Sequence, residues 1–243
     1  TVTSLSVANI TPVAIADGIS LSGAITVTAG SIKLAETGTL ASAISMSGGT
    51  TLDADNSLTV SGALTQSGDI EIDVLTDKTL SYTGAALRVG AKTLTLSGGG
   101  TFNNTNASNP LNPPVLILNH GGGILSLAGI LTITGQVVAT SSSPGKGIQV
   151  LSSATIGDLR SESHESNLAI AANQTLDGEL NISGSGVYIG ELNISGDGEY
   201  TGNIALAGGK LNAVDDLTLA GTVSISTSSE IFVPTGSTLV LNQ

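Results

Sequence analysis

Apolar and polar residues alternate along the chain in short runs that end at glycine. The runs share the order apolar, polar, apolar, small residue, glycine, as in LTVSG, which ends at Gly62, and LTLSG, which ends at Gly98. Two aliphatic residues separated by one polar residue place both apolar side chains on one face of an extended strand. Glycine then ends the strand, because it favours turns and weakens strand interiors. The pattern predicts an all-β chain of very short strands with one buried face.

The runs recur at fixed intervals. The heptad GELNISG occurs at 178–184 and again at 190–196, and residues 42–62 align without gaps on residues 78–98, an offset of 36. Fixed periods of this kind indicate a repeat architecture. We interpret each repeat as the same wall of a coiled chain, in which equivalent strands of successive coils pair in parallel. The longer period fits two coils of about 18 residues or one and a half coils of about 24, and both lengths stay open.

These observations predict a single parallel β-helix (β-solenoid) domain over residues 1–243, with about 10 to 13 coils. A hairpin meander is a weaker explanation, because two-residue Asp-Gly turns are few. Three segments interrupt the pattern, and we expect them to leave the stack as protruding loops. They are residues 101–114, rich in Asn and Pro, residues 140–147, and residues 157–167, which hold the densest cluster of charge.

Two stretches carry a resemblance to a known family. The segments ADGISLSGAITVTAGSIKLAETG (16–38) and DNSLTVSGALTQSGDIEID (55–73) resemble the β-helical passenger regions of bacterial autotransporters and filamentous-haemagglutinin-like surface adhesins. The likeness covers most of the chain. It implies a right-handed parallel β-helix that is exported to the cell exterior, and it transfers no site residue.

Composition narrows the possible partners. The chain has 19 acidic residues against 7 Lys and Arg, and charged residues make up only 11% of it. A surface without a basic stripe excludes nucleic acid and anionic membrane surfaces as binding partners. Residues 121–139 carry no charge, but Gly, Ser and Thr interrupt them and the apolar residues alternate as in strands, so we expect no membrane insertion. With five aromatic residues and no cysteine, the core must be aliphatic and without disulfides.

Few residues suggest site chemistry. Asp69, Glu71 and Asp73 alternate with apolar residues on one strand, so all three carboxylates face outward. They are weak candidates for Ca²⁺ ligands. Like-side residues lie about 6.6 Å apart along a strand, so we expect no metal site. We also expect no catalytic residue and no cofactor. The candidates for interactions lie in the predicted loops: Asn103, Asn106, Asp158, Arg160, His164 and Glu165.

The leading functional hypothesis is a non-enzymatic extracellular structural or adhesive solenoid, either an adhesin shaft or a subunit of a surface filament. The ends of a solenoid present unpaired strand edges, so we expect end-to-end self-association through residues 1–10 and 236–243. Other expected partners are surface carbohydrate or a ligand on a host or neighbouring cell. One alternative is a polysaccharide lyase or hydrolase, since β-helices host such enzymes. Another is ice binding through outward threonines such as Thr26 and Thr28.

Overall fold

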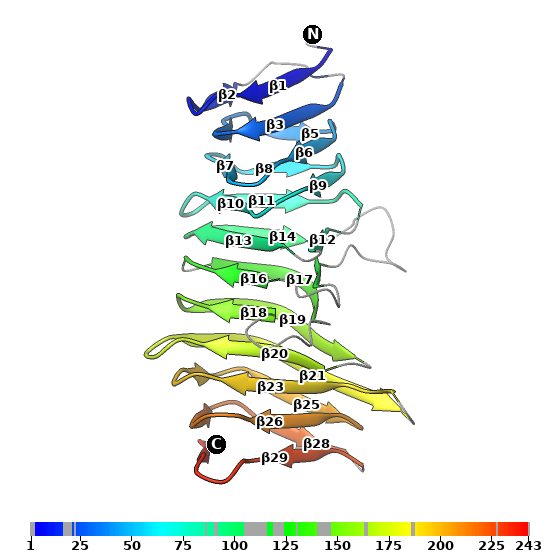
Figure 1. Cartoon of the computed structure of the whole chain (residues 1–243), viewed down its shortest axis with the longest axis vertical. Coiled ribbons are helices and arrows are strands. Elements are labelled where there is room, and N and C mark those ends of the chain that lie inside the picture. The colour runs from blue at the N-terminus through cyan, green and yellow to red at the C-terminus, as the bar shows by residue number, and fades with distance from the viewer. Residues whose placement is uncertain are drawn as a thin grey trace.

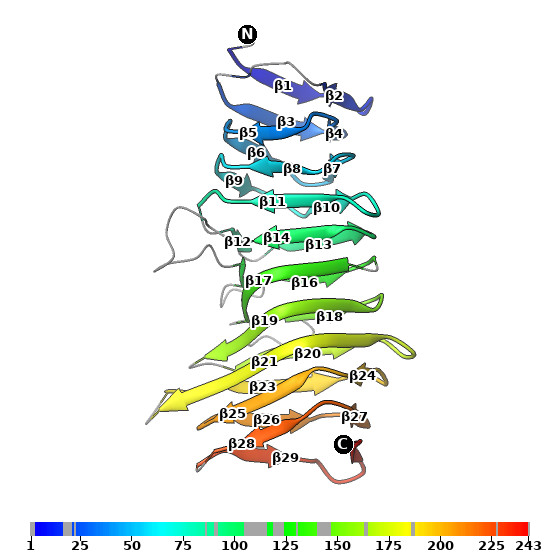
Figure 2. The same cartoon turned by 180° about the vertical axis from the view of Figure 1, so that it is seen from behind.

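The chain winds into a rod of stacked strands in the computed structural model (Figures 1 and 2). The structure describes residues 3–16, 21, 23–85, 87–89, 92–104, 116–118, 124–129, 131–139, 147–162, 165–185, 188–226 and 228–242. Thirty β-strands and no helix lie in these ranges, so the prediction of an all-β fold is confirmed. None of the described segments forms a helix of the length and apolarity that crossing a membrane requires.

The strands form three sheets, and the chain visits them in turn as it winds. The four-stranded sheet contains β1 (Leu5–Ala8), β3 (Ile25–Ala29), β6 (Ile44–Met46) and β9 (Leu64–Gln66). The eleven-stranded sheet contains β2 (Val13–Ile15), β4 (Ser31–Leu34), β7 (Thr50–Ala54), β10 (Ile70–Val74), β13 (Thr93–Gly98), β16 (Ile124–Leu127), β18 (Gly147–Val150), β20 (Glu165–Ile170), β23 (Glu191–Ser195), β26 (Lys210–Ala213) and β29 (Glu230–Phe232). The fifteen-stranded sheet contains β5 (Gly38–Leu40), β8 (Leu58–Val60), β11 (Thr79–Tyr82), β12 (Arg88–Val89), β14 (Thr101–Asn104), β15 (Leu116–Leu118), β17 (Leu131–Ala139), β19 (Ala154–Glu162), β21 (Thr175–Ser185), β22 (Tyr188–Ile189), β24 (Glu199–Tyr200), β25 (Asn203–Ala207), β27 (Leu217–Leu219), β28 (Val223–Ile225) and β30 (Leu239–Leu241).

Equivalent strands of successive coils pair in parallel, as the repeats predict. Among the described strand pairs, only β21 with β22 is antiparallel. In Figure 1 the strands nearest the viewer point left and those behind them point right while the chain descends from its N-terminus, and Figure 2 shows the same winding from behind. The coil is therefore a right-handed parallel β-solenoid.

The coils vary in length. Leu52 pairs with Ile72, an offset of 20, whereas Ile72 pairs with Leu96, an offset of 24. The offset from Leu96 to its partner Leu127 is 31, because this coil includes residues 105–115, which lie outside the described residues. Neither of the two lengths that the sequence left open, about 18 and about 24 residues, holds for every coil. The solenoid has about nine turns, slightly fewer than the predicted 10 to 13, because its longer coils use more of the chain.

The sequence repeats mark successive sides of a coil. The 36-residue period relates Ile44 of β6 to Leu80 of β11, which lie in different sheets, and the partner of Ile44 on the next coil is Leu64. The two GELNISG heptads likewise lie on β21 and β23, again in different sheets. The interpretation of the heptads as one wall repeated is therefore wrong. The same pattern recurs on every side because every side must bury one apolar face.

Aliphatic side chains stack in rows inside the rod. One row crosses the eleven-stranded sheet, and each of its members is at most 1% exposed: Ile32, Leu52, Ile72, Leu96, Leu127, Val150 and Ile170. Each coil covers the side chains of its neighbours, so strands of three to five residues share one continuous core.

The predicted loop at 157–167 is wrong where the structure describes it. Residues 157–162 belong to β19 and residues 165–167 belong to β20, both within sheets. Leu159 is buried between two outward charged residues, so the segment keeps the strand alternation despite its polarity. Of the other two predicted loops, β14 occupies 101–104 and Gly147 begins β18, whereas residues 105–114 and 140–146 lie outside the described residues.

Two buried tyrosines tie coils together. The backbone N–H of Leu64 donates to Tyr82 Oη at 3.1 Å, and Tyr82 Oη donates to the carbonyl of Ala85. Tyr200 Oη donates to the carbonyl oxygen of Gly178 at 3.0 Å. Burial raises the pKa of both phenols, because an ionised phenolate would lose its hydration in the core.

These phenols predict a loss of stability in alkali. A folded-state pKa above the unfolded value of about 10 contributes stability that is fully present below pH 10 and is lost as pH rises through the folded pKa. We expect the thermal midpoint to fall as pH increases above about 10, and to fall less steeply in Tyr200→Phe. Thermal unfolding from neutral to strongly alkaline pH measures this. Equal slopes for the wild type and the variant would contradict it.

Candidate functional site

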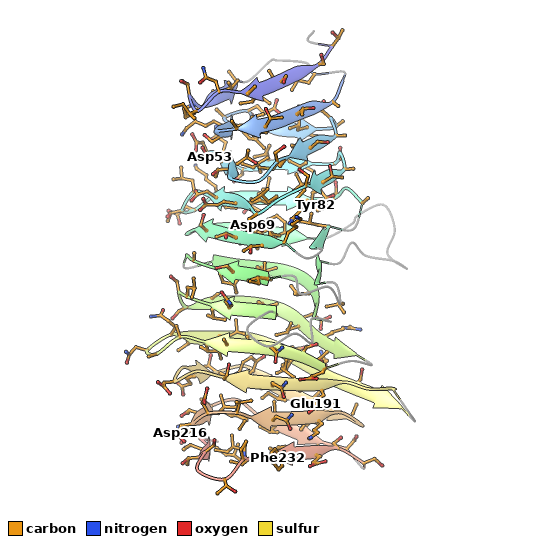
Figure 3. All side chains as sticks on the ribbon, viewed as in Figure 1. Asp53, Asp69, Tyr82, Glu191, Asp216 and Phe232 are labelled. Atoms are coloured by element: carbon orange, nitrogen blue, oxygen red, sulfur yellow. The ribbon has the colours of Figure 1, made fainter. Side chains whose placement is uncertain are left out.

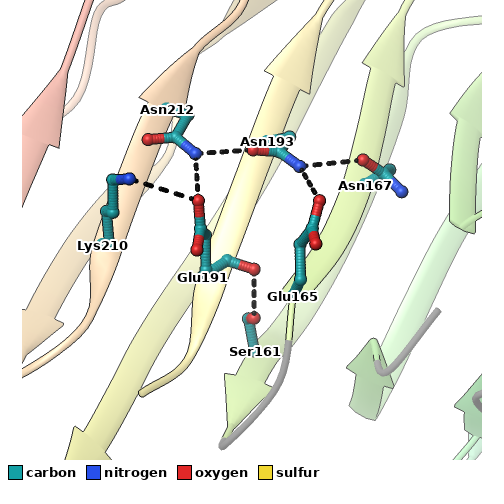
Figure 4. A network of polar contacts seen from close by, with 7 residues as sticks. All are labelled: Ser161, Glu165, Asn167, Glu191, Asn193, Lys210 and Asn212. Atoms are coloured by element: carbon teal, nitrogen blue, oxygen red, sulfur yellow. Dashed lines mark hydrogen bonds and ion pairs between the residues drawn. The ribbon is translucent and has the colours of Figure 1, made fainter. Parts of the chain in front are cut away.

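Two outward-facing columns of side chains cross the eleven-stranded sheet near the C-terminal end of the rod (Figures 3 and 4). Parallel pairing in register places equivalent residues of successive strands next to one another. The first column contains Glu165, Glu191, Lys210 and Glu230, and the second contains Asn167, Asn193, Asn212 and Phe232. We call the two columns together the polar ladder.

Asparagine amides connect successive rungs of the polar ladder. Asn193 Nδ2 donates to Glu165 Oε1 at 2.8 Å and to Asn167 Oδ1 at 3.1 Å. Asn212 Nδ2 donates in the same way to Glu191 Oε1 and to Asn193 Oδ1. Each amide therefore bridges two rungs, as the dashed lines in Figure 4 show.

The amide hydrogen bonds of the polar ladder end before its last rung. Lys210 Nζ lies 3.4 Å from Glu191 Oε1 and 5.3 Å from the centre of the Phe232 ring. Asn212 Oδ1 is buried and has no hydrogen-bond partner in the described structure. Phe232 occupies the next position of the column and offers this oxygen no donor. The amide ladder thus stops at Asn212, and an exposed aromatic ring ends the column.

A buried hydroxyl group holds the backbone of the ladder in place. Ser161 Oγ, fully buried at the end of β19, donates to the backbone carbonyl of Glu191 at 3.2 Å. The ladder's contacts join side chains of neighbouring strands, so the ladder stabilises the stacking of successive coils. Its partly exposed ion pair of Lys210 with Glu191 adds at most about 1 kcal/mol.

The three carboxylates that were weak candidates for a Ca²⁺ site also join coils. Glu71 and Asp73 face outward on β10, as predicted, and both carboxylates lie near Ser97 Oγ, at 2.6 and 2.9 Å. Asp69 Oδ1 accepts from the backbone N–H of Thr93 at 2.8 Å. Among the described residues, no three His, Cys, Asp or Glu side chains come together in a group able to hold a metal ion.

A neighbouring carboxylate is electrostatically perturbed. Asp53 on β7 is the parallel-sheet partner of Asp73 on β10. Figure 3 labels Asp53 and Asp69. Burial raises the pKa of the Asp53 carboxyl, and the charges of Asp73 and Asp55 raise it further. A hydrogen bond to Ser31 and the charge of Lys33, which also pairs with Asp55 at 3.3 Å, oppose this increase in pKa.

The structure brings two of the predicted interaction residues together. Asp158 and Arg160 face outward on β19, and Arg160 Nε donates to both carboxylate oxygens of Asp158 at 3.0 and 3.1 Å. Asn181 Nδ2 on the next coil donates to Asp158 Oδ1 at 3.1 Å. The charged pair is therefore part of a sheet surface that continues onto β21.

The other predicted interaction residues are dispersed. Glu165 begins β20 and belongs to the polar ladder. Asn103 lies on β14, where its Nδ2 donates to Ser81 Oγ at 3.4 Å. Asn106 and His164 lie outside the described residues.

The core rows end uncovered at the C-terminal end of the rod. Ile225 and Leu241 continue rows of buried residues, through their partners Leu206 and Leu219, yet they are 56% and 49% exposed. Phe232, Val233 and Val240 of the same rung are also exposed. The strands β28, β29 and β30 each pair with a strand on one side only, so three backbone edges are open as well.

The N-terminal rung differs from this end. Val7 of β1 and Ile15 of β2 belong to the first rung and are only 1% and 2% exposed, whereas Ile10, between the two strands, is 85% exposed. We define the apolar end face as Ile225, Phe232, Val233, Val240 and Leu241 of the C-terminal rung. Short-range sequence patterns do not reveal it. Ile225 and Leu241 follow the alternation of buried residues, whereas Phe232 and Val240 stand at outward positions, beside Asn212 and Thr218.

Comparison with protein families, curated proteins and solved structures finds no match for this chain. The structure confirms the parallel β-solenoid that the resemblance to adhesin passenger regions implies. The adhesin identity itself stays a prediction.

Proposed function

We propose that this chain is a non-enzymatic structural rod of the cell exterior, a shaft or filament subunit that lengthens by end-to-end stacking of copies. The observation that carries the proposal is the apolar end face. Large exposed apolar side chains are unfavourable in water, and the three open strand edges beside them form a template for further strand pairing. A second copy of the chain is the occupant we propose.

Head-to-tail stacking would continue the pairing that already builds the rod. In the proposed stack, β28 pairs in parallel with β1 of the next copy, and β29 pairs with β2. Each of β1 and β2 has one unpaired edge, as β28 and β29 do. The contact would cover Ile225 and Leu241 of the C-terminal rung, whereas Val7 and Ile15 of the N-terminal rung are already covered. A heterologous contact of this kind does not close on itself and gives filaments.

Charge placed on the apolar end face should prevent association. We expect the sedimentation coefficient of the wild-type chain to rise with concentration, and the double variant Ile225→Asp with Leu241→Asp to stay monomeric. Burying an unpaired carboxylate in an apolar interface costs several kcal/mol, which exceeds what such a contact would gain. Sedimentation velocity across micromolar concentrations is the measurement.

Leu151→Asp provides the matched control. Leu151 is 54% exposed, close to the value for Ile225, but it lies on the side of the rod. This variant should associate as the wild type does, with both variants retaining a β-sheet circular dichroism spectrum. A wild-type chain that stays monomeric throughout, or a double variant that associates equally well, would overturn the proposal.

A further inference from the structure

A polar hollow lies on the side of the rod, over β21, β25 and β28. Register places Ala205 between Asn181 on one side and Ser224 on the other. The methyl group of Ala205 is much smaller than its neighbours, and it leaves a hollow of about 300 Å³. The side chains around it are those of Glu179, Asn181, Asn203, Ala205, Thr222 and Ser224. The three strands lie side by side in the lower part of Figure 2.

Hydrogen bonds within the protein fix the two amides at the rim of the hollow. Asn181 Nδ2 is engaged by Asp158 Oδ1 at 3.1 Å, so Asn181 keeps its Oδ1 as an available acceptor. Asn203 Oδ1 accepts from the backbone N–H of Thr222 at 3.2 Å, so Asn203 keeps its Nδ2 as an available donor. These bonds orient the amides before any ligand arrives, which lowers the entropic cost of binding.

The remaining polar groups of the hollow are uncommitted. In the described part of the chain, the Glu179 carboxylate and the Ser224 hydroxyl have no hydrogen-bond partner, and both residues are exposed. Carboxylate and amide oxygens accept hydrogen bonds, the Asn203 amide donates them, and hydroxyls do both. The hollow therefore presents acceptors and donors close together around a small apolar floor.

Charge selects among the ligands that such a surface could bind. Glu179 is the one charged side chain among the described residues that line the hollow, and the neighbouring Asp158 is paired with Arg160. An anionic ligand would meet this carboxylate and a chain with a formal net charge of −12. A single carboxylate is a poor site for a divalent cation, which requires several oxygen ligands. A neutral ligand rich in hydroxyl groups satisfies all the groups present.

We propose that this hollow binds one unit of a neutral saccharide. Glu179 and Asn181 Oδ1 accept hydrogen bonds from sugar hydroxyls, and Asn203 Nδ2 donates to a sugar oxygen. The small side chain of Ala205 leaves space for the sugar ring. The hollow is open and lies at the small end of the range for ligand sites, so binding of a single sugar is weak, in the millimolar range. The site does not depend on end-to-end stacking, and the two proposals fail separately.

Saturation-transfer NMR with a panel of sugars tests the site on the intact chain. The probes are methyl glycosides of glucose, galactose, mannose and N-acetylglucosamine, with glucuronate as an acidic comparison. At least one neutral probe should bind, and glucuronate should bind more weakly. Glu179→Gln, which keeps the shape but removes the charge, and Ala205→Leu, which fills the hollow, should each weaken binding about tenfold or more.

Ala169→Leu is the matched control, because Ala169 is also a half-buried, outward-facing alanine on a central strand, β20. Its affinity for the neutral probe should equal that of the wild type. Binding that is unchanged in Glu179→Gln and in Ala205→Leu would overturn the proposal. A preference for glucuronate, or no signal from any neutral sugar, would also overturn it.

Discussion

Leu127→Ala is expected to lower the free energy of unfolding by about 2 to 5 kcal/mol. Leu127 is fully buried, and its neighbours in the core row are Leu96 on one coil and Val150 on the next. Alanine would leave a cavity between two rungs that the short, hydrogen-bonded strands cannot close. For a chain of this size, the thermal midpoint falls by roughly 2 to 4 °C for each kcal/mol, and differential scanning calorimetry measures it.

Leu75→Ala is the comparison that isolates burial. Leu75 directly follows β10, and its side chain is exposed. The same chemical change there should alter the free energy of unfolding by no more than about 0.5 kcal/mol. Similar losses in the two variants would show that Leu127 does not lie in a packed row.

Gly202→Ala should also be strongly destabilising, by about 3 kcal/mol. A Cβ atom on Gly202 would lie 1.8 Å from the carbonyl oxygen of Gly178 on the preceding coil. The contact is with backbone, so no side-chain rotation relieves it. The same carbonyl accepts the hydrogen bond from Tyr200, so movement of the backbone would also break that link. Chemical denaturation of the wild type and variant measures the loss.

Gly48→Ala is the matched control for close approach. A Cβ atom there would lie 3.5 Å from its nearest neighbour, the Cα atom of Gly68, which is an ordinary contact. Neither Gly48 nor Gly202 has a positive φ, so backbone strain does not separate the two. Gly48→Ala should be neutral or slightly stabilising, because alanine restricts the unfolded chain. Equal destabilisation by both substitutions would argue against close coil contact at Gly202.

Short-range alternation was sufficient to predict the fold. In LTVSG, Leu58 and Val60 are buried and Thr59 faces outward, as the pattern requires. Coil length was not predictable from the same pattern, since each of the three sides of a coil obeys it. A repeat between neighbouring sides, such as the GELNISG pair, therefore looks the same as a repeat between neighbouring coils.

The candidate sites were harder to predict. The charges of Asp158 and Arg160 suggested a loop, although Leu159 between them kept the alternation of a strand. Buried Ser161 obscured that signal, because a serine at an inward position looks polar in the sequence. The saccharide hollow depends on register between strands more than 20 residues apart, which brings Asn181 beside Ala205. No local pattern encodes that pairing.

Electron microscopy of negatively stained particles tests the structural role most directly. Concentrated wild-type protein should form rods of constant width whose lengths are multiples of one molecular length, and the double variant Ile225→Asp with Leu241→Asp should give single-length rods. Rods of a single length at every concentration of the wild type would contradict end-to-end stacking, and compact particles would contradict the solenoid itself.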